Sequence, residues 1–187
     1  HMGKLGSYEP IEITKEWIES IRKLAPGNPV AVPKQKRRVL MFSVSTGYMH
    51  WVIPHTAEIV KIIAETSGAF VVEETEDPES FVPKNLKRFD AVIFNNNCSM
   101  DEKRDLFLDI LGDEARSETL RKNILAYVSA GGGLVSLHGG IIAFNNAEDW
   151  GEMQGGSFDN HPAQQELFLT TADPSHPLVQ AFRGKPF

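Results

Sequence analysis

The sequence of 187 residues is acidic: 19 basic and 25 acidic side chains give a formal net charge of -6, and 41% of the residues are hydrophobic. At about 150 residues per domain, this length predicts one globular domain with a single core. The negative balance argues against general binding to nucleic acid or to an anionic membrane surface, and it favours a small neutral or weakly charged ligand. The single cysteine, Cys98, excludes an internal disulfide.

Residues 1–37 are interpreted as a leader and linker. The start His1-Met2-Gly3 is typical of an expression tag, so a natural signal peptide removed from the chain would leave no trace. We therefore expect a cytoplasmic protein, or a periplasmic one if such a peptide was removed. Residues 14–24 predict a short helix, capped by Thr14, that lies against the outside of the core. The basic run at 34–38 is interpreted as a solvated linker rather than a nucleic-acid or targeting patch.

From residue 38 onward, predicted strands and helices alternate. Apolar runs predict strands at 39–43, 69–72, 90–95, 134–137 and 166–170, and helical periodicity predicts helices at 54–66 and 118–129. Pro54 suits the first turn of one helix and Gly68 its end, whereas the glycines at 131–133 suit the end of the other. The alternation predicts an α/β fold with a parallel sheet between two helical layers, and ligands of such sheets bind at the carboxyl ends of the strands.

Several histidines and asparagines follow the predicted strands and should meet at that edge. His50 follows the first strand, Asn95, Asn96 and Asn97 follow the third, and His138 ends the fourth. Two glycines come directly after His138, a context typical of the sharp elbow that presents a nucleophile in other α/β enzymes. Because histidine stands where serine or cysteine would be, nucleophilic acyl transfer lacks its central atom. Cys98 shows no sign of a lowered pKa and is a weak candidate for a hydrolase nucleophile.

Two chemistries fit these side chains, and the sequence leaves both open. His50, His138 and His161, with help from Glu166, could bind a divalent metal such as zinc. Alternatively, His138, His161 and Glu166 could act directly as acid/base catalysts on a sugar, without a metal. Candidate substrate-binding residues are His50, the amides Asn95, Asn96 and Asn97, and the aromatic residues Trp51 and Trp150, although the amides could equally form a turn and the aromatics could close the core.

Taken together, these motifs resemble the ThuA-like, or trehalose-utilisation, family. The matching stretches are residues 38–55, 89–98, 127–139, 150–162 and 173–178. The resemblance implies a class I glutamine amidotransferase-like fold, which is a flavodoxin-like three-layer sandwich with a mainly parallel sheet, over residues 38–187. Relatives usually continue past the position of Phe187 with a further strand, so this domain is expected to be truncated at its carboxyl end.

The resemblance also implies a role in carbohydrate metabolism. The expected activity is that of a hydrolase or lyase that processes a keto-glycoside or another disaccharide-derived sugar, with a divalent metal near the strand-end histidines. The expected partner is a small carbohydrate rather than nucleic acid or membrane, and a homo-oligomer is compatible with the sequence. A non-catalytic carbohydrate-binding or sensing module on the same fold is the alternative, because the elbow lacks cysteine.

Overall fold

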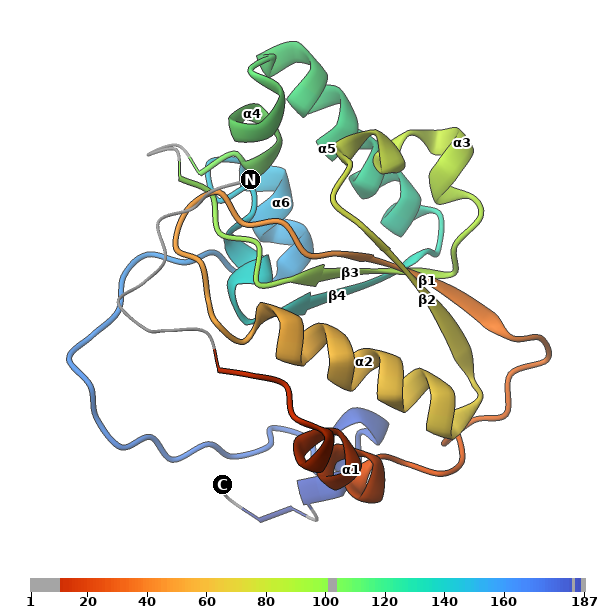
Figure 1. The fold of residues 1–187 in the computed structure, drawn as a ribbon. Helices are drawn as coiled ribbons and strands as arrows, with labels where there is room; N and C mark the ends of the chain where they lie inside the picture. The colour runs from red at the N-terminus through yellow and green to blue at the C-terminus, as the bar shows by residue number, and fades with distance from the viewer. Residues whose placement is uncertain (1–10, 101–103, 183, 186–187) are drawn as a thin grey trace.

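The computed structural model describes residues 11–100, 104–182 and 184–185, and its centre is a sheet of four parallel strands (Figure 1). The strands are β1 (Arg37–Phe42), β2 (Phe70–Thr75), β3 (Ala91–Asn95) and β4 (Gly133–Leu137), and their order in the sheet is β2-β1-β3-β4. Each strand is followed by a helical connection before the next one begins. The predicted α/β fold with a parallel sheet is therefore confirmed.

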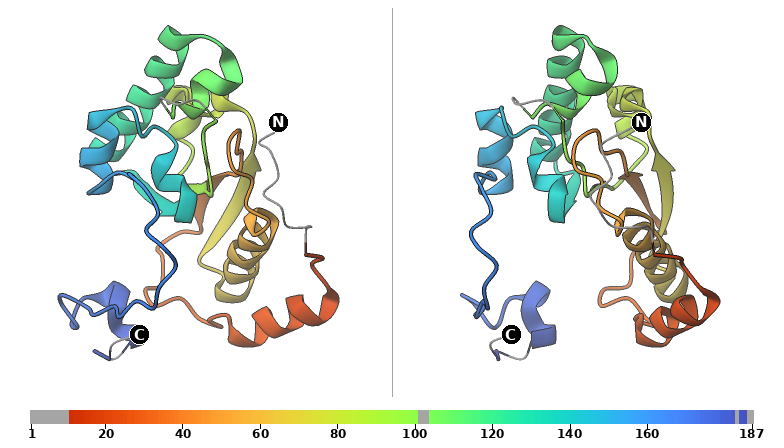
Figure 2. Two further views of the ribbon diagram at one scale, coloured as in Figure 1. Left: turned by 90° about the vertical axis from the view of Figure 1, so that its left-hand side faces the viewer. Right: turned by 60° about the vertical axis from the view of Figure 1, so that its left-hand side comes forward.

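Helices cover both faces of this sheet, as the two views of Figure 2 show. One face is covered by α2 (Ile53–Ser67), with α1 (Lys15–Leu24) on its outer side. The other face carries α3 (Pro83–Leu86), α4 (Leu106–Leu111), α5 (Glu114–Ser129) and α6 (Glu148–Gln154). Short 3-10 helices within the described residues are η1 (Pro78–Phe81), η2 (His138–Ile142) and η3 (Pro177–Phe182). No helix in the described part of the chain is both long and apolar enough to cross a bilayer.

The side chains of β1 alternate between two apolar clusters. Val39 and Met41 pack with Ala57 on the α2 side, whereas Leu40 and Phe42 belong to the larger cluster under α4, α5 and α6. This alternation follows from the period of two in a strand, and burial on both faces explains why the strand is a continuous apolar run. The flavodoxin-like three-layer sandwich is thus built on two cores of unequal size.

The predicted helix ends agree with the structure. The Thr14 side chain accepts a hydrogen bond from the backbone nitrogen of Trp17 at 3.2 Å, and Gly68 ends α2 in a left-handed conformation with φ of 66°. Pro54 lies in the first turn of α2. The interpretation of residues 34–38 as a linker is wrong in part, because Arg37 and Arg38 belong to β1, where Arg37 forms an ion pair with Asp90 at 2.6 Å.

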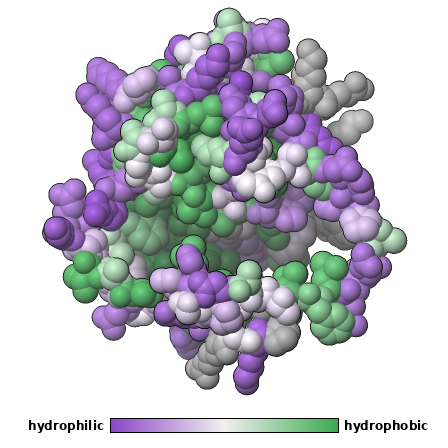
Figure 3. Space-filling model, turned by 180° about the vertical axis from the view of Figure 1, so that it is seen from behind, coloured by the Kyte–Doolittle hydropathy of each residue, from purple (hydrophilic) through white to green (hydrophobic). Residues whose placement is uncertain are grey.

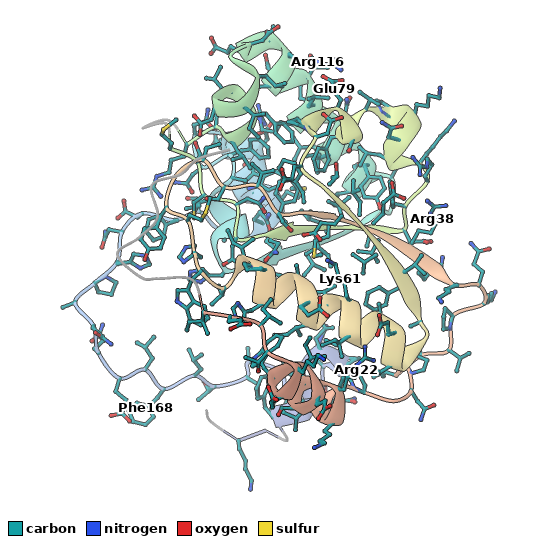
Figure 4. All side chains as sticks on the ribbon, in the orientation of Figure 1. Arg22, Arg38, Lys61, Glu79, Arg116 and Phe168 are labelled. Atoms are coloured by element: carbon teal, nitrogen blue, oxygen red, sulfur yellow. The ribbon has the colours of Figure 1, made fainter. Side chains whose placement is uncertain are left out.

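The strand predicted at 166–170 is wrong. These residues have no regular secondary structure and are exposed, with Leu167 66% and Phe168 80% accessible. Figure 4 shows Phe168 on an extended segment that runs apart from the body of the molecule. The apolar pattern is suited to a strand, but no other strand among the described residues pairs with it, and a strand is stabilised only by its neighbours.

Candidate functional site

A cavity of about 1010 Å³ lies at the carboxyl ends of β1, β3 and β4. This is the edge at which a parallel sheet was expected to bind its ligand. The cavity is lined by residues of the loops that follow these strands, by η2 and by a later segment; they are Tyr48, His50, Cys98, Ser99, Met100, Arg104, His138, Gly139, Ile141, Ile142, Phe158 and His161.

The turn at His138 has the predicted elbow geometry. His138 follows β4 directly, has a φ of 48°, and begins the 3-10 helix η2. The two glycines after it permit a close approach to the neighbouring strand end: a Cβ on Gly139 would lie 2.7 Å from Cys98 Sγ, and one on Gly140 would lie 2.5 Å from the Phe94 carbonyl oxygen. Larger residues do not fit at Gly139 and Gly140, so the two glycines allow the tight turn that places His138 at the carboxyl end of β4.

Backbone strain is concentrated around the cavity. Three residues other than glycine have a positive φ in the described chain: Asn96 (56°), Arg104 (54°) and His138 (48°). All three lie in segments that follow strand ends, and two of them line the cavity. Such conformations cost about 1 kcal/mol or more each and persist where the surrounding structure requires them, often at functional sites.

Three histidines from distant parts of the sequence meet in this cavity. The rings of His50 and His138 have centroids 4.5 Å apart at an angle of 81°, and the His161 ring contacts Phe158 at 4.8 Å. Burial lowers the pKa of His50, and the positive charges of His138 and His161 lower that pKa further. His50 is therefore held in its neutral form more strongly than an exposed histidine, which suits a proton acceptor.

The wall formed by the loops after β1 and β3 is held by backbone hydrogen bonds. The carbonyl oxygen of Cys98 accepts from the Thr46 and Gly47 nitrogens at 2.9 and 2.8 Å and from Ser45 Oγ at 3.1 Å. Asp109 Oδ2 accepts from Ser99 Oγ at 2.7 Å and from the Met100 nitrogen at 2.8 Å. These bonds hold one side of the cavity in place before any ligand arrives.

The three consecutive amides lie behind this wall and do not line the cavity. Asn95, Asn96 and Asn97 are buried, at most 1% exposed. Asn95 Nδ2 donates to Ser43 Oγ at 3.1 Å, and Asn97 Nδ2 donates to the Val44 carbonyl oxygen at 2.7 Å. In this arrangement the amides join the end of β3 to the loop after β1.

Three further predicted site residues lie away from the cavity. Trp150 is 1% exposed within the larger core and donates from Nε1 to the Ile141 carbonyl oxygen at 3.1 Å. Trp51 contacts the His55 ring at 5.3 Å and is not part of the lining. Glu166 lies in the exposed segment that follows His161. Of the predicted residues, the structure therefore brings together His50, His138 and His161.

Arg104 lines the cavity and was missed by sequence reasoning. Its guanidinium lies over the Phe158 ring at 4.7 Å. In the sequence it ends the charged run 101–104, a pattern typical of a solvated loop, so nothing local indicated a role. Its left-handed backbone and its aromatic partner become visible only in the folded chain.

The arrangement is compatible with acid/base chemistry by the histidines, and the structure gives one observation on each of the other two chemistries. Burial raises the pKa of the Cys98 thiol to about 11, with only partial opposition from the positive charge of Arg104, so the thiol stays protonated at neutral pH. In the described part of the chain, no group of three or more histidine, cysteine, aspartate or glutamate side chains is placed to hold a metal ion. As arranged here, the three imidazoles do not form a set of zinc ligands.

Comparison with known protein families matches residues 38–186 to ThuA, the trehalose utilisation family. The chain belongs to the ThuA family. The match begins at the first strand and includes every segment that lines the cavity, and ThuA membership supports a role related to the use of carbohydrates. Comparisons with curated proteins and with solved structures gave no match.

Proposed function

We propose that this ThuA protein is an enzyme that processes a keto-glycoside, with the histidines of the cavity as its acid/base groups. The observation that supports this proposal is the convergence of His50, His138 and His161 on one cavity, with the His50 and His138 rings 4.5 Å apart. Imidazole is the side chain best suited to proton transfer near neutral pH. The cavity volume of about 1010 Å³ is sufficient for a disaccharide.

The proposed reaction is an elimination. A keto group at C3 of a pyranose acidifies the hydrogen at C2, and His50, whose pKa is lowered, accepts that proton. The electron pair of the C2–H bond forms the C1–C2 double bond, the bond from C1 to the glycosidic oxygen breaks, and His138 donates a proton to the departing oxygen. Addition of water across the new double bond would complete a hydrolysis, so the lyase and hydrolase activities share one first step.

Aromatic side chains from two segments of the lining complete the proposed sugar site. Tyr48 contacts the His50 ring at 4.6 Å, and Phe158 lies beside His161. Their ring faces offer apolar surface for the CH groups of a sugar, whereas the imidazoles offer hydrogen bonds to its hydroxyl groups. A sugar in this position would have its anomeric carbon near the pair formed by His50 and His138.

The variant His138→Asn tests the proposal. Asparagine tolerates a positive φ, so the elbow is retained while the acid/base group is removed. We expect turnover of a 3-keto-disaccharide to fall by about 10²–10⁴-fold, the usual contribution of a general acid or base. His176→Asn is the control, since His176 lies in an exposed turn outside the cavity. Unchanged turnover in folded His138→Asn would remove His138 from the mechanism.

Two other outcomes would favour different functions. Stoichiometric zinc in the purified protein, with activity lost on chelation and restored by zinc, would support metal-assisted chemistry, with the histidines rearranged around the ion. Binding of sugars without chemical change over long incubation would support the non-catalytic carbohydrate-binding module. The binding module is supported by two observations: histidine stands at the elbow in place of a nucleophile, and the raised pKa keeps the Cys98 thiol protonated.

A further inference from the structure

Arg104 differs from the other arginines that the structure describes. Each of the others forms an ion pair with a carboxylate; these are Arg22, Arg37, Arg38, Arg88, Arg116 and Arg121. Figure 4 shows one such pair, Arg116 beside Glu79. Arg104 forms no ion pair with any described carboxylate, and its guanidinium instead contacts the Phe158 ring.

The described lining of the cavity contains no carboxylate, and the carboxylate of Asp109 lies behind the wall, where it accepts hydrogen bonds from Ser99 and Met100. Among the described residues that line the cavity there is one permanent cation, Arg104, and no aspartate or glutamate. The protein as a whole carries a net charge of -6, so a described lining without acidic side chains differs from the overall composition. The guanidinium carbon lies 4.7 Å from the centroid of the Phe158 ring. A guanidinium that stacks on a ring face keeps the N–H donors at the edge of its plane for a ligand.

Arginine in such a position is suited to one class of ligand. The planar guanidinium donates two parallel hydrogen bonds to a carboxylate or a phosphate, and these bonds are stronger than those between neutral groups. Phe158 links Arg104 to the acid/base groups, because its other contact is the His161 ring at 4.8 Å. An oxyanion bound by Arg104 would therefore place the attached sugar towards the three histidines.

We propose that the cavity takes a sugar that carries an oxyanion, either a carboxylate or a phosphate, and that Arg104 binds this group. The inference rests on the proposed function in one respect, namely that the ligand is a carbohydrate. It differs from the expectation of a neutral or weakly charged ligand that the overall composition suggested, because the charge of a site is set by its lining and not by the net charge of the chain.

Calorimetric titration of the full chain with matched sugars tests this proposal. Glucuronate and glucose 6-phosphate, each compared with glucose, separate a carboxylate from a phosphate as the preferred group. We expect at least one of the two acids to bind about tenfold or more tightly than glucose, as one charge-assisted bidentate pair allows. In Arg104→Gln this preference is expected to disappear. In Arg104→Lys, which keeps the positive charge but loses the two parallel N–H donors, the preference is expected to become smaller.

Arg88→Gln is the matched control. Arg88 also stacks on a phenylalanine, with its guanidinium 5.3 Å from the Phe89 ring, but it lies outside the cavity. This variant should keep the preference for the acidic sugar. Thermal unfolding of all three variants identifies any that fail to fold, and the Lys variant then carries the test in place of the Gln variant.

Three outcomes would overturn the inference. The first is equal affinity for acidic and neutral sugars, and the second is an acidic preference that persists in folded Arg104→Gln. The third is binding of inorganic phosphate as tight as that of glucose 6-phosphate, which would indicate a simple anion site. Binding is measured without turnover, so the two proposals can fail separately. If acidic sugars bind through Arg104 but turnover is unchanged in His138→Asn, the proposed function alone is overturned. If turnover is lost in His138→Asn but acidic sugars bind no more tightly than neutral ones, this inference alone is overturned.

Discussion

Cys98 lies in the loop after β3, where its carbonyl oxygen accepts four hydrogen bonds from the loop after β1. Its side chain is 4% exposed, and burial raises the pKa of the thiol to about 11. At neutral pH the thiolate is therefore a very small fraction of the total. The residue contributes its backbone to the cavity wall, and its reactivity is suppressed by the same burial.

The alkylation rate of native Cys98 is expected to keep increasing with pH well past the range in which an ordinary cysteine levels off. The sign follows from the pKa: below about 11, each unit of pH raises the thiolate fraction about tenfold, whereas a free thiol levels off near its pKa of about 8.5. Iodoacetamide labelling followed by mass spectrometry between pH 7 and 10 measures this. Protein unfolded in urea is the control, and a plateau near 8.5 in the native protein would contradict the raised pKa.

Residue types and their place after strands were enough to predict three histidines of the cavity. His138 stood out because a polar residue between an apolar run and two glycines is unusual, and His50 and His161 were found by the same reasoning about strand ends. Trp150 and the three amides were predicted to bind substrate, but whether such side chains face a ligand or the core depends on their partners in the folded chain, which a sequence does not show. Trp150 is enclosed by the core, and Asn97 hydrogen-bonds to backbone carbonyl groups.

The secondary-structure elements with a clear apolar pattern over several residues were predicted best. The strands β1, β2, β3 and β4 and the helices α2 and α5 all appear where apolar periodicity placed them. The short helices α4 and α6 were missed, because six or seven residues carry too few turns for a periodic pattern. The segment 166–170 has the pattern of a strand without a partner, which shows that pairing, and not the pattern alone, forms a strand.

The leader helix α1 docks on α2 through an aromatic cluster. Trp17 contacts the His55 ring edge to face at 5.1 Å, and Arg22, labelled on α1 in Figure 4, forms an ion pair with Glu65 at 2.6 Å. Neither ring nitrogen of the buried His55 has a hydrogen-bond partner among the described residues. The aromatic contact therefore contributes most to docking, since exposed ion pairs such as Arg22–Glu65 contribute little.

Trp17→Ala is expected to release α1 while the sheet remains folded. An edge-to-face pair with partial burial contributes about 1–2 kcal/mol, so cleavage in the linker at residues 25–36 should become about tenfold faster. Limited trypsin digestion followed by gel electrophoresis measures this rate. Leu24→Ala on the same helix is the control, because Leu24 is 83% exposed. Equal cleavage of the two variants would show that Trp17 does not hold the helix.

At the scale of the whole molecule, the sheet has an open edge. On its outer side β4 pairs with no other strand in the described chain, and Val135 in the middle of it is 45% exposed. Figure 3, seen from behind, shows a hollow with apolar surface at its centre. An unpaired edge strand favours pairing between copies of a chain, so we propose that the chain of residues 1–187 associates with itself through β4.

Val135→Lys is expected to weaken this self-association. A charge on an edge strand opposes pairing, because the ammonium group would lose its water at the interface. Light scattering over a range of protein concentrations should show a growing mass for the original protein and a constant monomer mass for the variant. Val30→Lys, in the linker at a site 97% exposed, adds the same charge elsewhere and should behave like the original. A monomer at all concentrations would contradict the proposal.

The two walls of the cavity differ in how they are attached to the molecule. The wall after β1 and β3 is held by several backbone hydrogen bonds, whereas in the described residues the segment with Phe158 and His161 is hydrogen-bonded to the body through Asn145 alone. Asn145 Nδ2 donates to the Phe158 carbonyl oxygen at 2.7 Å, and its Oδ1 accepts from the Phe158 nitrogen at 2.9 Å. The Asn145 side chain, together with the contact between Arg104 and the Phe158 ring, thus sets how far the second wall stands from the first, and with it the width of the entrance through which a substrate must pass.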